Sequence, residues 1–154
     1  MTPQERLASM GISLPAVPRP IGSYVPALRW GTTVLTSGQL PSRDGRVMFA
    51  GKVGSEIPLE RAIEAAHLAA VNALAAAAEA AGGVDEIVRV LRACVYVNSA
   101  PGFIDQPKVA NGASDFLGAV FGEAGRHVRA AVGVAELPLN AAVELELIVE
   151  VRSQ

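Results

Sequence analysis

The chain has 154 residues, of which 51% are hydrophobic and 18% charged, with a formal net charge of −2. This length predicts one domain with a sizeable buried core, and the composition excludes an intrinsically disordered chain. The acidic balance and the few aromatic residues (four Phe, two Tyr and one Trp) argue against a general nucleic-acid or membrane-surface binder.

The cysteine content and the apolar segments indicate where in the cell the protein is located. The one cysteine, Cys94, cannot form an internal disulfide, and we interpret it as a buried, unreactive packing thiol. The N-terminus lacks a basic-then-apolar leader, and polar residues interrupt the Ala-rich stretch 62–82, so we expect neither a signal peptide nor a membrane span. We therefore expect a cytoplasmic protein. Its high apolar fraction also favours self-association that hides apolar surface.

The N-terminal region predicts a helix followed by a connector. Thr2-Pro3-Gln4-Glu5 has the pattern of a capping box, which predicts a short helix to about residue 10. Pro15, Pro18 and Pro20 then predict an extended segment, because proline cannot occupy a helix interior.

The next region predicts β-structure. Residues 24–30 and 32–37 have the composition of two strands, and the second runs into Ser37-Gly38-Gln39. Glycine there indicates either a close approach of the backbone to another group or a simple strand end. Residues 42–46 predict a tight turn, followed by a short strand over 47–50.

Two long helices and one long strand are predicted in the middle of the chain. Apolar residues at three- and four-residue spacing predict a helix over 59–81, ended by Gly82-Gly83. Residues 86–98 predict a strand and 106–121 a second helix. His67 has no second ligand at metal-binding spacing, so we interpret it as a packing or surface residue and expect no metal.

The C-terminal stretch 125–152 predicts two strands joined at Leu137-Pro138-Leu139-Asn140. Alternation over 143–151 predicts one core-facing and one polar face. In the first strand Arg129 stands among small residues, which suits an anion pocket, although a solvated edge arginine explains the same pattern. His127 could share its face, but without a nucleophile partner it fits a surface residue better than a catalytic one.

The predicted element order is β-β-β-α-β-α-β-β, with neither a repeat nor a long linker. It indicates one α+β domain over 1–154, with a mixed sheet and two helices on one face. We assign Arg129, Glu144 and Glu146 to the opposite face. That face is too apolar to be left to solvent, so a partner subunit is its expected cover.

The expected hairpin constrains the site. If 125–152 is a regular hairpin, Arg129 and Glu144 lie about 20 Å apart in one chain. A site that uses both residues must then lie between subunits. Phosphate loops, Cys-x-x-Cys pairs and nucleophile elbows are absent from the sequence, which leaves an arginine able to grip a carboxylate and acidic and backbone groups able to hold water.

Several motifs together resemble those of the Rid family, also known as YjgF or endoribonuclease L-PSP-like proteins. They are Ile21-Gly22-Ser23-Tyr24, residues 35–40 (LTSGQL), residues 128–134 (VRAAVGV) with Leu137-Pro138, and residues 143–146 (VELE). The resemblance covers 20–152 and leaves 1–19 as an N-terminal helix and Pro-rich connector. Residues 109–115 (VANGASD) resemble a branch distinct from the best-known members.

The resemblance implies a chorismate-mutase-like fold and a homotrimer whose sheets form a central barrel with clefts between subunits. It also implies cofactor-free hydrolysis of reactive 2-imino and enamine acids, of the 2-aminoacrylate type, to 2-keto acids and ammonia. The implied partners are a small carboxylate substrate and two further copies of the chain, without nucleic acid or membrane.

The resemblance also implies residue roles. Arg129 would bind the substrate carboxylate, and Glu144 would help to hold the attacking water. Tyr24 would line the cleft, and Ser37 and Gly38 would contact the substrate.

Two positions depart from the family pattern. Ala131 replaces the cysteine common two residues after the arginine. Asn111 is the nearest candidate for the helix asparagine of better-known members.

Two other functions stay open from the sequence. The same clefts could bind a small carboxylate for regulation without turnover. An RNA-cleaving or translation-inhibiting role follows from the family's older label, but the acidic charge and few aromatics disfavour it. The sequence also leaves open the physiological imine, its upstream enzyme and the preferred side-chain size.

Overall fold

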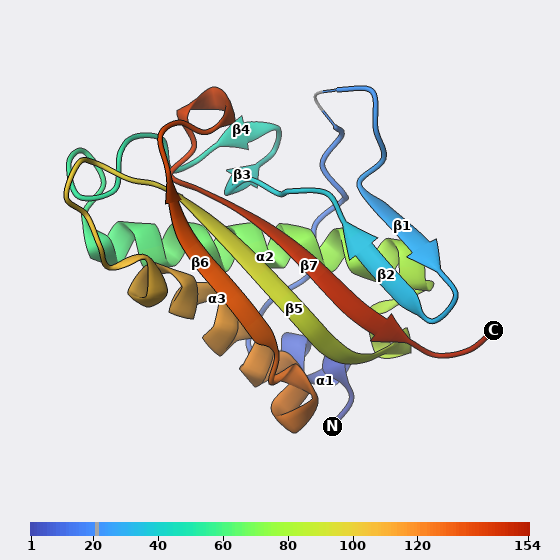
Figure 1. Ribbon diagram of the computed structural model, residues 1–154. Helices are drawn as coiled ribbons and strands as arrows, with labels where there is room; N and C mark the ends of the chain where they lie inside the picture. The colour runs from blue at the N-terminus through green and yellow to red at the C-terminus, as the bar shows by residue number, and fades with distance from the viewer. Residues whose placement is uncertain (21) are drawn as a thin grey trace.

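The computed structural model describes residues 1–20 and 22–154, so Ile21 of the first motif lies outside the described residues. Its main elements are α1 (Pro3–Ser9), β1 (Ala27–Trp30), β2 (Thr33–Thr36), β3 (Ser42–Arg43), β4 (Arg46–Val47), α2 (Leu59–Ala81), β5 (Ile87–Asn98), α3 (Gln106–Phe121), β6 (Val128–Val134) and β7 (Val143–Val151). Short 3-10 turns lie at Val84–Glu86, Gly122–Gly125 and Pro138–Asn140. A five-stranded sheet has the order β1-β2-β7-β5-β6, and the helices lie together behind it (Figure 1).

The helix predictions are confirmed. Local chemistry marks the ends of the helices. The Thr2 hydroxyl accepts a hydrogen bond from the Glu5 backbone N–H, and the Glu5 carboxylate accepts one from the Thr2 N–H, which completes the capping box of α1. Helix α2 ends at Gly82, whose φ of 92° is left-handed. The bounds of α2 and α3 are those expected from the sequence.

The core lies between the sheet and the two long helices. One row of β7 is fully buried, and it alternates with partly exposed residues, as the sequence pattern predicts. Buried alanines of α2 let the helix approach both the sheet and α3 closely. The approach is tightest at Gly112 of α3, where an added Cβ would lie 3.0 Å from the Ile63 carbonyl carbon and closer still to its oxygen.

The predicted hairpin between β6 and β7 is wrong. Strand β5 lies between them, parallel to β6 and antiparallel to β7. The reason is that α3 forms the crossover connection that parallel pairing requires, so β6 pairs with β5 at the edge of the sheet. The segment before β7 then meets the end of β5, where the Asn98 N–H donates to the Ala142 carbonyl oxygen.

The predicted faces are also partly wrong. Arg129 pairs with Ala93, which pairs with Leu147, and both partners are buried, so Arg129 projects from the helix-covered face. Glu144 lies in the row of Tyr96 and Val132 on the open face. The prediction that put Arg129 on the same face as Glu144, about 20 Å from it, assumed the hairpin.

Strand β5 does not alternate uniformly. Register shifts lie between Ile87 and Arg89 and between Val90 and Arg92. They turn Val90 into the core, although strict alternation would place it on the same face as Arg92.

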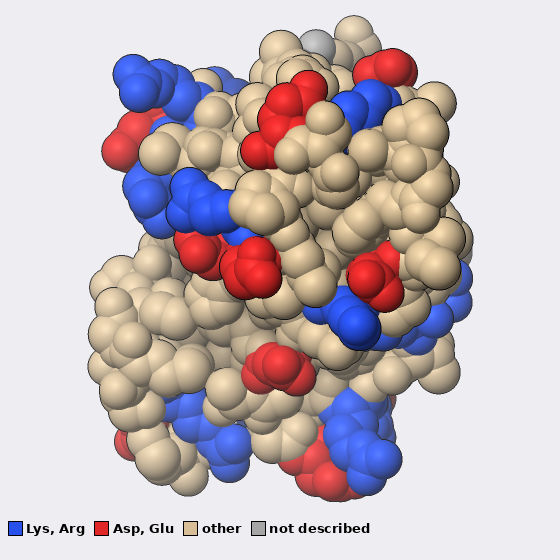
Figure 2. Space-filling model, turned by 90° about the vertical axis from the view of Figure 1, so that its left-hand side faces the viewer, with Lys and Arg blue, Asp and Glu red and all other residues tan. Residues whose placement is uncertain are grey.

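The open face of the sheet is apolar for a surface. Large side chains on it are exposed, among them Leu28 at 57%, Trp30 at 79% and Val128 at 64%. Figure 2, which views the molecule from the left-hand side of Figure 1, shows acidic and basic side chains interspersed, without a broad basic patch. In the part of the chain that the structure describes, no helix is both long and apolar enough to cross a bilayer.

The contact between α2 and α3 predicts opposite effects of two alanine substitutions. Gly112→Ala is expected to lower the free energy of unfolding by about 1–3 kcal/mol, because the methyl group is forced against the α2 backbone. Gly118→Ala, in the same helix with nothing within 4 Å, is expected to raise it by up to about 1 kcal/mol through helix propensity. Urea denaturation measures both, and equal effects would contradict the close contact.

Candidate functional site

Glu144 and Gly38 form the centre of one group of predicted site residues. Gln39 and Leu145 exchange two backbone hydrogen bonds of 2.7 and 2.9 Å, which tie the end of the β2 segment to the start of β7. This pairing sets Gly38 directly against Glu144: a Cβ on Gly38 would lie 2.5 Å from Oε2 and 2.7 Å from Cδ. The glycine therefore leaves room for the carboxylate, and the simple strand end is the weaker interpretation.

Ser37 and Tyr24 lie on the segments beside this carboxylate. The Ser37 hydroxyl donates a 2.6 Å hydrogen bond to the Val25 carbonyl oxygen, which fixes the approach of the chain to β1. Tyr24, next to Val25, is half exposed and lines the same cavity as Gly38 and Glu144.

The environment of Glu144 makes its carboxylate a stronger base than an exposed one. Burial raises the pKa of the Glu144 carboxyl above its usual range, and the neighbouring Glu146 carboxylate raises it further. A carboxyl group that holds its proton more readily is suited to accept a proton from water and return it to a leaving group.

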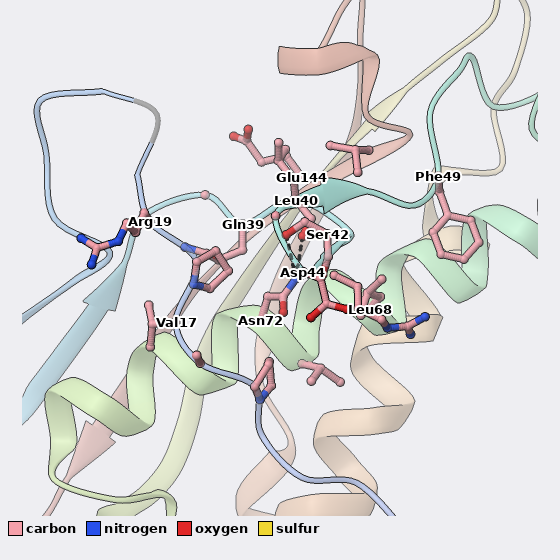
Figure 3. Close-up of a pocket in the computed structure, with 18 of the residues that line it drawn as sticks. Val17, Arg19, Gln39, Leu40, Ser42, Asp44, Phe49, Leu68, Asn72 and Glu144 are labelled. Atoms are coloured by element: carbon pink, nitrogen blue, oxygen red, sulfur yellow. Dashed lines mark hydrogen bonds between the residues drawn. The ribbon is translucent and has the colours of Figure 1, made fainter.

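A cavity of about 920 Å³ extends from this carboxylate. The connector 11–20 lines one side, and the β3–β4 hairpin and α2 line others, as Figure 3 shows. The Asn72 amide of α2 donates hydrogen bonds of 2.9 Å to the carbonyl oxygens of Leu40 and Ser42, drawn as dashed lines in Figure 3. These bonds fix the hairpin over the helix.

Arg129 belongs to a second group, between β6 and α3. Its Nη1 donates to Asn111 Oδ1 at 2.8 Å and to Ser114 Oγ at 3.1 Å, and its Nη2 donates to the Pro107 carbonyl oxygen at 3.3 Å. These bonds use three of the five guanidinium N–H donors, which leaves two for a ligand. Ala131, two residues along β6, packs against the core and offers no thiol.

His127 continues this polar group. Its Nδ1 lies 2.6 Å from the Gly125 carbonyl oxygen, and its Nε2 lies 2.9 Å from Ser114 Oγ. Because a carbonyl only accepts, we assign the proton to Nδ1, so Nε2 of the neutral ring accepts from Ser114. Ser114 is then both a donor to His127 and an acceptor from Arg129. We did not single out Ser114 from the sequence, although its spacing of three from Asn111 puts both on one helix face.

The two groups are apart within one chain. Tyr24, Ser37, Gly38 and Glu144 lie together, whereas Arg129, Asn111 and Ala131 lie across β5 from them. The observed register separates the Cα atoms of Arg129 and Glu144 by about 14 Å, from three residues at ~3.3 Å and two strand spacings at ~4.8 Å. This replaces the hairpin distance of about 20 Å, and the two side chains project from opposite faces. One small substrate therefore cannot contact both in one chain.

In residues 1–20 and 22–154, no group of three or more His, Cys, Asp and Glu side chains is arranged to hold a metal ion.

Comparison with known proteins identifies the family of this chain. The model of the YjgF/chorismate mutase-like endoribonuclease family matches residues 4–151. The chain belongs to this family. The recognition made from the motifs is confirmed, as is the mixed-sheet fold that it implied.

Three similar proteins illustrate the family. "Protein TCP17" of Trypanosoma cruzi is 41% identical, over 96% of this chain and 92% of its own. The "2-iminobutanoate/2-iminopropanoate deaminase" of Dermatophagoides farinae is 33% identical over 90% and 93%. The crystal structure of Atu1372 from Agrobacterium tumefaciens, whose function is given as unknown, has a TM-score of 0.90 at 42% identity and covers 97% of this chain and 92% of its own.

The raised pKa of Glu144 predicts a pH-dependent effect of Glu144→Gln. The folded chain holds this proton more tightly than the unfolded chain, whose carboxyl has a pKa near 4.5. The associated stability is present below that value and is lost as the pH rises through the folded pKa. The free energy of unfolding of Glu144→Gln, relative to wild type, should therefore increase from pH 4 to pH 7 in urea titrations. A constant difference would contradict the pKa shift, and Glu79→Gln at an exposed position of α2 serves as the control.

The bonds around Ser114 predict that it orients Arg129. Ser114→Ala removes one of the acceptors of the guanidinium and leaves His127 Nε2 without its donor. We expect binding of pyruvate, a small 2-keto acid probe, to weaken about tenfold in calorimetry, as for a lost hydrogen bond to a charged group. Ser114→Thr keeps the hydroxyl and should retain most of the affinity. Equal affinity of all three proteins would show that Ser114 does not orient Arg129.

Proposed function

We propose that this protein hydrolyses reactive 2-imino and enamine acids to 2-keto acids and ammonia, at clefts between subunits of a homotrimer. The observation that carries the proposal is that two complementary groups project from opposite faces of the sheet. They are the Arg129 guanidinium, which has two N–H donors left for a ligand, and the half-buried Glu144 carboxyl, whose pKa is raised. The relative named as an imine deaminase supports the reaction class.

The residues have defined roles in this proposal. Arg129 of one subunit binds the substrate carboxylate through its free N–H donors, and Asn111 and Ser114 hold the guanidinium in place. Glu144 of a neighbouring subunit faces the imine carbon. Tyr24 closes the cleft, and the segment at Ser37 and Gly38 provides backbone groups for the substrate.

The reaction needs only water and proton transfer. An enamine first tautomerises to the imine, whose C=N carbon is electrophilic. Glu144 accepts a proton from water as the oxygen attacks that carbon, and the imine nitrogen takes a proton from solvent. Glu144 then returns its proton to the nitrogen of the carbinolamine, the C–N bond breaks, and ammonia leaves. The hydroxyl group releases its proton to solvent and becomes the carbonyl group of the 2-keto acid. A cofactor is not required, because the substrate is already activated and the protein orients it.

The open sheet face supports the trimer. Leu28, Trp30 and Val128 expose apolar side chains on it, and burial against copies of the same face would remove them from water. A barrel of three such sheets would also bring β6 of one subunit toward the β2 and β7 segments of the next. We propose a cytoplasmic location, in keeping with the buried free thiol of Cys94.

A second candidate is a trimer that binds a small carboxylate without turnover. Ala131 favours it, because the cysteine common at this position in the family is absent and any chemistry of that thiol is lost. RNA cleavage has less support, since the net charge is −2 and charges of both signs intermix in Figure 2.

Mixing two inactive variants tests both the reaction and the shared site. Arg129→Ala and Glu144→Gln are each expected to lose at least about 100-fold in kcat/KM for freshly generated 2-aminoacrylate. If each site takes Arg129 and Glu144 from different subunits, unfolding and refolding an equal mixture should restore up to about one quarter of the wild-type activity. The measurement is ammonia release, and each variant refolded alone is the control.

The possible outcomes separate the candidates. Activity in the wild type but none in the mixture would place the site within one chain. A folded wild-type trimer that accelerates hydrolysis of no imine, yet binds pyruvate in an Arg129-dependent way, would favour the carboxylate-binding candidate.

A further inference from the structure

The cavity beside Glu144 is much larger than a three-carbon imino acid requires. Its volume is about 920 Å³, and pockets of about 300–1,000 Å³ hold drug-sized ligands. Tyr24, Gly38 and Glu144 line one end, and the rest lies between the connector and α2. A substrate whose reacting carbon faces Glu144 therefore has unfilled space beyond it.

The connector forms a firm wall of this space. Helix α1 anchors its start, because Leu7 is fully buried and its carbonyl oxygen accepts from the Ile12 N–H. Beyond it, the rings of Pro15, Pro18 and Pro20 line the cavity and fix the backbone φ at three positions. The wall is thus built by the segment between α1 and β1.

The inner surface of the cavity is suited to an apolar group. Ile12 and Val17 of the connector lie on one side, and Leu68 and Val71 of α2 lie on another. These side chains offer dispersion contacts and no hydrogen-bond partners, so a polar side chain of a substrate would lose its water there without compensation.

The polar residues of the lining do not change this conclusion. Burial lowers the pKa of His67, so its ring is neutral at pH 7. The ring packs edge-on against that of Phe116, with the two ring centroids 4.9 Å apart. The Asn72 amide group donates to the hairpin carbonyls. Apart from Glu144, the charged residues of the lining, which are Arg19, Arg43, Asp44 and Glu64, are all exposed.

We infer that the preferred substrates are 2-imino acids with long, branched or aromatic apolar side chains, which lie between the connector and α2. This inference rests on the proposed deaminase function and specifies its substrate class. Each additional methylene group buried in the cavity is expected to raise kcat/KM about fourfold.

A substrate series with a cavity-filling variant tests the inference. An amino-acid oxidase generates the imines of alanine, norvaline, leucine and phenylalanine, and kcat/KM is measured by keto-acid release. The wild type should favour the leucine and phenylalanine imines over the alanine imine by at least about tenfold. Val17→Trp should remove this preference and leave kcat/KM for the alanine imine within about twofold, because the added ring occupies only the distal space.

Controls keep the result specific. Ser9→Trp adds the same ring on exposed α1, outside the cavity lining, and should keep the wild-type preference. Circular dichroism establishes that the Val17→Trp protein is folded. Wild-type preference for the alanine imine, or an equal loss on all four substrates in Val17→Trp, would overturn the inference.

Failure of the proposed function would be distinguishable. If no imine is hydrolysed faster than in buffer, the deaminase proposal fails, and binding of unreactive 2-keto acids tests the cavity separately. Tighter binding of 4-methyl-2-oxopentanoate than of pyruvate, lost in Val17→Trp, would support an apolar side-chain site. Equal affinities for the two acids would reject it.

Discussion

The pairing of Gln39 with Leu145 is the contact on which the candidate site depends. Two backbone hydrogen bonds join the chain just after β2 to the start of the central strand β7. This pairing places Gly38 against Glu144. The chain then continues into the β3–β4 hairpin over α2, where hydrogen bonds from Asn72 hold it. A single stretch of main-chain pairing thus sets both the environment of the carboxylate and one wall of the cavity.

The second half of the site depends on α3. As the connection between the parallel strands β5 and β6, this helix lies behind them and presents Asn111 and Ser114 to Arg129. The guanidinium is therefore oriented before any ligand arrives, which reduces the entropy lost on binding. One half is positioned by the segment after β2 and the other by α3. This explains why Glu144 and Arg129 lie in different halves of the candidate site.

Local signals in the sequence were sufficient for the elements but not for their arrangement. The capping box at Thr2 and the glycines after Ala81 mark helix ends wherever they occur, so α1 and α2 could be predicted closely. Strand pairing is a non-local property. Two consecutive strands joined by a Pro-Leu-Asn turn resemble a hairpin, and only the length of α3 argued that β6 would join β5 in parallel.

The same distinction holds for the site. Motifs identified Arg129, Glu144 and Gly38 from their neighbours in the chain. The face on which Arg129 stands followed from the sheet order, which the sequence pattern did not contain. The link from Ser114 to His127 joins residues of two elements, and small polar side chains of this kind are common on any helix surface.

The Pro-rich connector has a consequence for divergence within the family. It shapes the cavity but contributes little to the sheet–helix core, so substitutions in it can alter which molecules are accepted at small cost to folding. Substitutions of the buried alanines of α2 have less freedom, since these side chains pack in the core. If the proposed substrate class holds, natural variation in the connector can therefore change selectivity while the core contacts of α2 are preserved.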